Sequence, residues 1–173
     1  MASAAGRSKT ASTSSGQRSQ KKLQVNSTVL EEFSPVGWYR LPPTDRIGVL
    51  RVGVPSDWLI RTEALMHLPR QTLCRMLGLP TSTIKRRLND NARLNPDESE
   101  RLMGLHQLIG QVEAMVEEAG DPEGFKAAPW LAAWLERPNL ALGGQRPADL
   151  MDTAEGRSLV SRLLGMIRSG AYA

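Results

Sequence analysis

Few side chains in this sequence could carry out catalysis or hold a metal ion. The 173 residues include one cysteine, Cys74, and two histidines, His67 and His106. A single cysteine excludes an intramolecular disulfide framework and a Cys-rich zinc site, and no His/Cys/acid cluster has metal-site or triad spacing. We expect Cys74 to be a small packing residue and both histidines to be surface or capping residues. The sequence therefore predicts no enzymatic activity and no cofactor.

The segment from Gln71 to Leu88 indicates DNA binding instead. A helix-turn-helix needs a small residue where its helices cross and a glycine in the turn, and Cys74 and Gly78 have that spacing. Apolar residues expected to lock the second helix are Leu73, Leu77, Leu79 and Ile84. The predicted DNA contacts, which are hydrogen-bonding or cationic side chains, are Gln71, Thr81, Ser82, Thr83, Lys85, Arg86 and Arg87.

One residue departs from the helix-turn-helix pattern. Arg87 lies nine residues after Gly78, where an apolar side chain is expected, and Leu88 follows it. The second helix is therefore predicted to be slightly rotated. An ordinary helical hairpin with a basic solvated face is the alternative interpretation of this segment.

Charge is distributed unevenly along the chain. Residues 1–22 carry five cations and no acid, and residues 55–94 carry a net charge of +4. Residues 95–173 carry a net charge of −5. Phosphate contacts supply much of DNA affinity, so the basic middle suits a polyanion that the C-terminal half would repel.

The chain is predicted to be mainly α. Residues 1–22 are Ser/Ala-rich and almost without apolar side chains, so they are interpreted as a disordered basic arm. Residues 23–54 are expected to be irregular or to form short strands, Ile47–Val54 being the best strand candidate. Residues 55–120 are predicted to hold the helix-turn-helix and a long helix that begins at Asn95 and ends at Gly120. Residues 121–173 are predicted to form a second helical domain whose last helix begins near Thr153.

The C-terminal residues carry a more specific signal. The string Asn139-Leu-Ala-Leu-Gly-Gly-Gln-Arg-Pro147 leads to Leu150-Met-Asp-Thr-Ala-Glu-Gly156, and a helix then ends in Leu163-Leu-Gly-Met-Ile-Arg-Ser-Gly170 and a short tail with Tyr172. This pattern closely resembles the toxin-binding domain of the MbcA/ParS/Xre antitoxin family. Met151 stands where that family has a leucine. The domain order, an Xre/Cro-like helix-turn-helix followed by this domain, also matches.

The resemblance implies the antitoxin of a type II toxin–antitoxin pair in the bacterial cytoplasm. Its partner would be a RES-domain toxin that consumes NAD, and it would repress its own operon by binding operator DNA. The C-terminus would insert into the toxin's active site. A homodimer or a larger hetero-oligomer with toxin is expected, and no membrane association is expected. The residues assigned to toxin binding are Leu163, Ile167, Arg168, Gly170, Ala171, Tyr172 and Ala173.

Three questions stay open at the level of sequence. A stand-alone transcription regulator with a C-terminal dimerisation or protein-binding domain is the alternative function. A small enzyme is the third and weakest hypothesis, and turnover of NAD by the pure protein would support it. The arm, residues 1–22, would either add nonspecific phosphate contacts or serve as a solubilising tail, and an organelle transit peptide is a less favoured interpretation of it.

Overall fold

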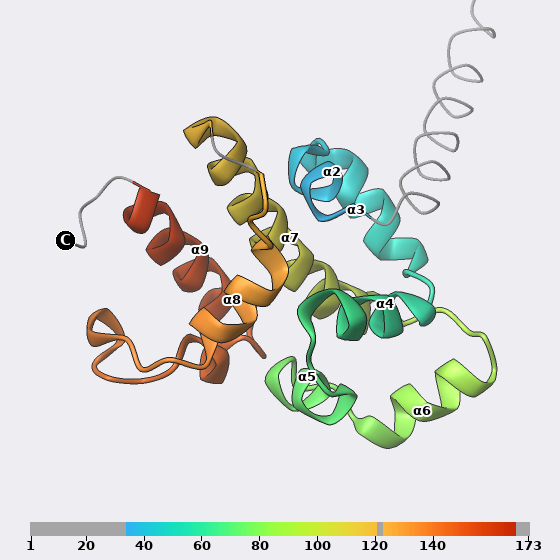
Figure 1. Cartoon of the computed structure of the whole chain (residues 1–173). Coiled ribbons are helices and arrows are strands. Elements are labelled where there is room, and N and C mark those ends of the chain that lie inside the picture. Colours follow the sequence, from blue (N-terminus) through green and yellow to red (C-terminus); the bar gives the residue numbers. More distant parts are fainter. Residues whose placement is uncertain (1–33, 121–122, 169–173) are drawn as a thin grey trace, which may run out of the picture.

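A computed structural model describes residues 34–120 and 123–168 (Figure 1). Every regular element in these two ranges is helical, which confirms the predicted mainly α class. Their extended pairing is limited to one isolated bridge between Pro55 and Arg93. The helices are α2 (Pro35–Arg40), α3 (Pro43–Val52), α4 (Asp57–Met66), α5 (Arg70–Met76), α6 (Thr81–Asn89), α7 (Pro96–Ala119), α8 (Ala127–Leu135) and α9 (Ala154–Arg168), with 3₁₀ turns at Leu140–Leu142 and Pro147–Leu150.

The long helix α7 is the element on which the others pack. Its start is fixed by a capping box in which Asn95 Oδ1 accepts from Glu98 N and Glu98 Oε2 accepts from Asn95 N, both at 2.8 Å. Gly120 ends it in a left-handed conformation at φ 82°. The predicted start and end are therefore both confirmed. Because α7 contacts α2, α3, α8 and α9, it connects the two halves of the protein (Figure 1).

The expectation of irregular chain or strands before residue 55 is wrong for the described residues. Helices α2 and α3 lie there, and the strand candidate Ile47–Val54 is mostly the second half of α3. Prolines begin both helices: Pro35 and Pro43 occupy first-turn positions, where a missing N–H costs nothing. Ser34 Oγ also caps α2 by accepting from Gly37 N at 3.1 Å. Residues 23–33 lie outside the described ranges, as does the predicted arm 1–22.

Gly110 allows α2 to lie directly against α7. A Cβ at this position would fall 2.6 Å from the Pro35 carbonyl carbon and 2.7 Å from Tyr39 Cβ. The first of these atoms belongs to the backbone, so it cannot move aside by changing rotamer.

Gly110→Ala is therefore expected to lower the free energy of unfolding by about 2 kcal/mol or more, because α2 must shift away from α7. Gly165→Ala is the matched control. No atom lies within 4 Å of a Cβ built there, and alanine in an exposed helix interior is favoured over glycine by about 0.5–1 kcal/mol. Urea denaturation of both variants gives the comparison. A Gly110→Ala protein as stable as wild type would contradict this packing.

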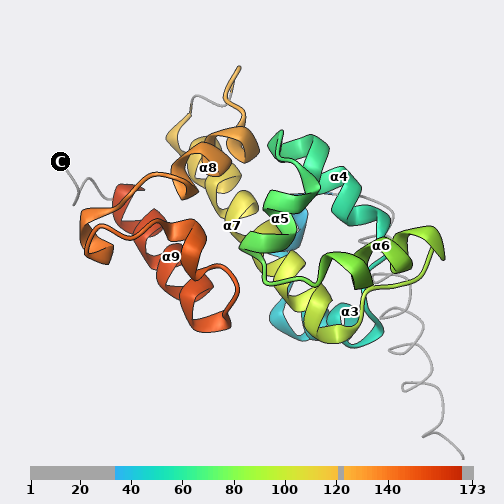
Figure 2. The ribbon, with the colours of Figure 1, turned by 90° about the horizontal axis from the view of Figure 1, so that it is seen from below.

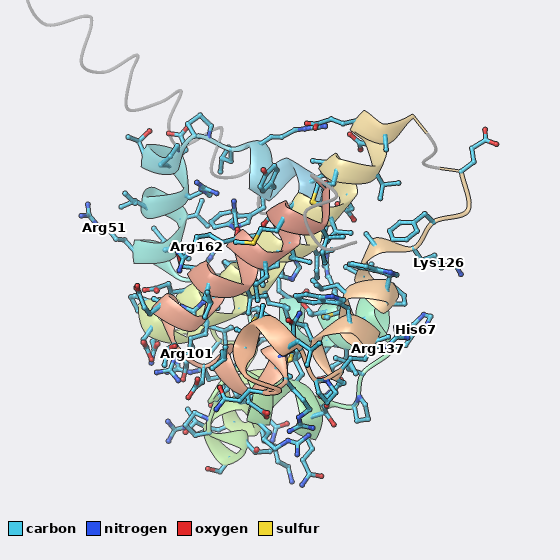
Figure 3. The ribbon with its side chains drawn as sticks, turned by 90° about the vertical axis from the view of Figure 1, so that its left-hand side faces the viewer. Arg51, His67, Arg101, Lys126, Arg137 and Arg162 are labelled. Carbon is cyan, nitrogen blue, oxygen red and sulfur yellow. The ribbon has the colours of Figure 1, made fainter. Side chains whose placement is uncertain are left out.

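The two histidines differ in environment. His67 is exposed and ends α4 in a left-handed conformation at φ 55°, as a surface capping residue would (Figure 3). The same expectation is wrong for His106, which is 1% exposed on α7. Packing of α7 against helices on several sides buries this residue.

His106 connects α7 to α4 through a buried hydroxyl. Thr62 Oγ1 lies 2.8 Å from His106 Nε2 and donates to the Trp58 carbonyl at 2.7 Å. Because that hydroxyl has one hydrogen, we assign the hydrogen of the imidazole to Nε2, which then donates to Thr62. Burial lowers the pKa of His106 to about 3 from 6.5.

This pKa predicts a loss of stability in mild acid. In the unfolded chain His106 takes up a proton below pH 6.5, whereas in the folded chain it does so only near pH 3. The stability that depends on neutral His106 is therefore fully present above pH 6.5 and is lost as the pH falls. From pH 7 to pH 5 the expected loss in free energy of unfolding is about 2 kcal/mol. Urea denaturation should show a shallower loss for His106→Gln and an unchanged one for His67→Gln. Equal slopes for wild type and His106→Gln would contradict the assignment.

Candidate nucleic-acid interface and the opposite end of the molecule

Helices α5 and α6 form the predicted helix-turn-helix. Cys74 is fully buried on α5, and burial raises the pKa of its thiol, which suits a packing residue. Gly78 takes the left-handed conformation, φ 61°, in the turn. The four predicted locking residues are all buried, namely Leu73, Leu77, Leu79 and Ile84.

The outer face of α6 is polar and cationic. Among the predicted DNA contacts, Thr83 is half-buried, and the exposed ones are Gln71, Thr81, Ser82, Lys85 and Arg86. Helix α6 lies at the edge of the molecule in two perpendicular views (Figures 1 and 2). Such a helix has the placement and the side chains needed to enter a major groove.

Arg87, the residue that departs from the helix-turn-helix pattern, is half-buried against the start of α7 rather than part of this outer face. Its Nε is 2.7 Å from Glu98 Oε2, and its side chain is 23% exposed against 5% for Glu98. Arg87 Nη1 also donates to the Arg93 carbonyl at 3.1 Å. The ion pair fixes the end of α6 to the start of α7. Arg87 thus positions the helix, and Leu88 packs against the core beside it.

Glu98 is the functional residue that the sequence interpretation missed here. Its carboxylate both closes the capping box and pairs with Arg87. In the sequence, an acid three residues after Asn95 signals only a helix cap. Its partner on α6 becomes evident only when α6 and α7 are folded together.

The turn of the helix-turn-helix is also attached to α7. Arg101 Nη1 donates to the Gly78 carbonyl at 2.9 Å, and Arg101 Nη2 pairs with Asp97 at 3.1 Å (Figure 3). Asp152, from the segment before α9, approaches the same glycine. The candidate DNA-binding helices are therefore held in place by α7 at both ends of α6.

Residues of the C-terminal motif stabilise the start of α9. Thr153 Oγ1 accepts from Gly156 N at 3.0 Å, which caps the helix. Gly156 lies against the Leu150 backbone so closely that a Cβ would overlap it. Arg157 is buried, which lowers its pKa, and it donates to the Met151 carbonyl at 3.0 Å and to Glu100 at 3.1 Å.

The predicted toxin-binding residues divide into three groups. Leu163 is buried within the chain itself, so the structure removes it from the candidate surface contacts. Ile167 is exposed near the end of α9, and Arg168 is the last residue of that helix. Residues 170–173, which carry the remaining predicted contacts, lie outside the described ranges.

The two candidate surfaces lie far apart. The end of α9 is on the left of the molecule in two perpendicular views, and α6 is on the right (Figures 1 and 2). Over the described residues, no group of three or more His, Cys, Asp or Glu side chains could hold a metal ion. None of the described helices combines the length and apolarity needed to cross a membrane.

The fold and these surfaces define a helix-turn-helix protein with a second helical domain at its C-terminal end. Residues 45–105 match the family model of the antitoxin Xre-like helix-turn-helix domain. Residues 112–170 match that of the antitoxin Xre/MbcA/ParS C-terminal toxin-binding domain. The short stretch between the two matches, residues 106–111, lies within α7.

Curated relatives agree with both domain matches. The chain is 46% identical over 141 residues to the Prs ADP-ribosylating antitoxin of Sphingobium sp. (strain YBL2). The aligned region covers 82% of this chain and 89% of that protein. It is 26% identical over 123 residues to Antitoxin Xre of Yersinia enterocolitica, covering 71% and 78%. The Antitoxin Xre of Pseudomonas putida is 28% identical over 119 residues, covering 68% and 67%. The chain belongs to the Xre/MbcA/ParS antitoxin family and is the antitoxin of a toxin–antitoxin system.

Proposed function

We propose that this antitoxin neutralises a RES-type, NAD-consuming toxin by inserting residues 170–173 into the toxin's active site. We also propose that it represses its own operon through α6. The observation that carries both halves is the placement of an exposed cationic helix at one end of the molecule and of the end of α9 at the other (Figure 2). One protein can then hold DNA and toxin at the same time.

The chemistry of the toxin is supported by the name of the Sphingobium relative. That name contains the word ADP-ribosylating, and ADP-ribosyl transfer uses NAD as the donor of ADP-ribose. A NAD-consuming partner is consistent with this chemistry. The word antitoxin in the same name disfavours a stand-alone transcription regulator, which would have no toxin partner.

The residues after α9 suit insertion into a cavity. Gly170 and Ala171 are small, so they fit a narrow entrance, and Tyr172 is an aromatic side chain of the kind that dominates binding energy when it fills a pocket. Ile167 is exposed, lies three residues before Gly170 in the sequence and would contact the rim of such a cavity. Arg168 would lie at the same rim.

The DNA half of the proposal rests on α6. Lys85 and Arg86 are exposed cations for phosphates or guanine edges, and Thr81 and Ser82 are exposed hydroxyls at the start of the helix. Gln71 at the start of α5 is placed for a flanking contact. A dimer would present two copies of α6 about 34 Å apart, one turn of DNA.

Co-expression with the product of the neighbouring toxin gene tests the proposed function directly. The two proteins are expected to co-purify through size-exclusion chromatography as one complex, and the toxin in it is expected to leave NAD intact. DNA from upstream of the gene pair is expected to shift with the antitoxin. Separate elution of the two proteins, with NAD still consumed, would refute the proposal.

A further inference from the structure

Leu140 is held in solvent by the chain around it. Its side chain is 93% exposed, the highest value for a large apolar residue among residues 34–120 and 123–168, and the next is Val52 at 59%. Single exposed apolar residues are common on protein surfaces. The structure and place of the loop that carries Leu140 distinguish this residue from such cases.

The loop is closed by its own backbone. Asn139 N donates to the Gln145 carbonyl, and Gly144 N donates to the Asn139 carbonyl, both at 3.0 Å. Asn139 Oδ1 accepts from Ala141 N at 2.9 Å. Gly143 and Gly144 have φ values of 65° and 85°, which favour glycine. Leu140 is thus presented on a defined 3₁₀ turn.

Ion pairs hold the chain at the base of the loop. Arg146 Nη1 lies 2.9 Å from Glu136 Oε2, and Arg146 Nη2 lies 2.6 Å from Asp149 Oδ1. Glu136 precedes the loop and Asp149 follows it, so this cation joins the two sides. A loop that is ordered before binding loses little conformational entropy when a partner covers it.

The loop lies within the toxin-binding domain and on its outer side. Residues 112–170 match the toxin-binding family model, and Leu140 is inside that range. The loop and the end of α9, where Ile167 is exposed, both lie on the left of the molecule in Figures 1 and 2, away from α6. A toxin bound at the end of α9 would therefore meet the side that carries Leu140.

We propose that Leu140 is a second toxin contact, which inserts into an apolar depression on the toxin surface outside its active site. This inference rests on the proposed function. It gives the antitoxin two separate points of attachment, the loop and residues 170–173. The loop adds affinity and orients the domain, whereas the C-terminal residues block the active site.

The test compares Leu140→Ser with Val52→Ser by isothermal titration calorimetry against the purified product of the neighbouring toxin gene. Burying a leucine side chain changes binding by about 1.5–3 kcal/mol, so Leu140→Ser is expected to weaken Kd by about 10- to 100-fold. Leu140→Met, which stays apolar, is expected to retain most of the affinity. Val52→Ser removes the next most exposed large apolar side chain of the described residues from α3, outside the toxin-binding domain, and is expected to change Kd by less than about two-fold.

Folding and DNA binding provide the internal controls. Leu140 packs against little of its own chain, so Leu140→Ser is expected to keep Tm within about 3 °C of wild type and to leave operator affinity unchanged. Wild-type affinity in a folded Leu140→Ser protein would overturn this inference and leave the proposed function standing. No binding by the wild-type chain would overturn both. Dissociation of an antitoxin dimer by Leu140→Ser, with toxin affinity unchanged, would assign the loop to a second copy and overturn the inference.

Discussion

Deletion of Gly170–Ala173 is expected to abolish protection from the toxin while operator binding survives. The deleted residues include Tyr172, the proposed aromatic anchor, and they lie beyond α9, whose buried side packs on α7. The fold and the helix-turn-helix are therefore expected to stay intact. Cells that express the toxin with the truncated antitoxin should stop growing and lose NAD, whereas gel shifts with the truncated protein should match wild type.

Substitutions of Tyr172 refine the same experiment. Tyr172→Ala removes the anchor and is expected to weaken toxin binding by about 30-fold or more, the scale of an interface hot spot. Tyr172→Phe keeps the ring and is expected to protect cells. If cells with the four-residue deletion grow normally beside an active toxin, the insertion mechanism is wrong.

The double variant Lys85→Ala plus Arg86→Ala is expected to lose operator binding by about 100-fold or more while still neutralising the toxin. Both cations are exposed on α6. Removing a cation that binds a phosphate is expected to reduce the slope of log K against log salt by about one. Fluorescence anisotropy at several salt concentrations measures both the affinity and this slope.

A charge-matched control separates specific contacts from overall charge. Arg137→Ala plus Arg162→Ala also removes two exposed cations, and both belong to the C-terminal domain (Figure 3). This variant is expected to bind operator DNA with an affinity within about three-fold of wild type, because these side chains lie away from α6. Equal losses in the two double variants would show that net charge, and not α6, governs DNA binding.

Local sequence signals predicted the parts of the fold that depend on local chemistry. The capping box at Asn95 and the glycine that ends α7 are determined within a few residues, and so is the turn at Gly78. The mainly α class followed from such patterns, whereas both antitoxin domains were predicted from the resemblance to the MbcA/ParS/Xre family. The family models and the relatives confirm these domains.

Features that depend on contacts distant in sequence could not be predicted. Irregular chain or short strands were expected before residue 55, but α2 and α3 form there because they pack on α7. His106 is buried beside Thr62 of α4, and the residues next to His106 in the sequence do not reveal this contact. Arg87 resembled a DNA contact because its partner, Glu98, belongs to the next helix.

In the candidate toxin-binding surface, too, some features depend on local sequence and others on contacts between distant residues. The motif around Asn139 identified the family, but it does not indicate how far Leu140 projects into solvent. The apolar pattern of α9 could not distinguish buried Leu163 from exposed Ile167, because the rotation of α9 on α7 decides which residue faces inward.

A structure of the complex with the neighbouring toxin would test the central claim most directly. The proposal predicts that residues 170–173 lie inside the cavity where the toxin binds NAD, with the Tyr172 ring enclosed by toxin side chains. It also predicts that α6 remains free for DNA on the far side of the antitoxin. A complex in which Tyr172 and Ala173 lie in solvent, with the NAD cavity open, would contradict it.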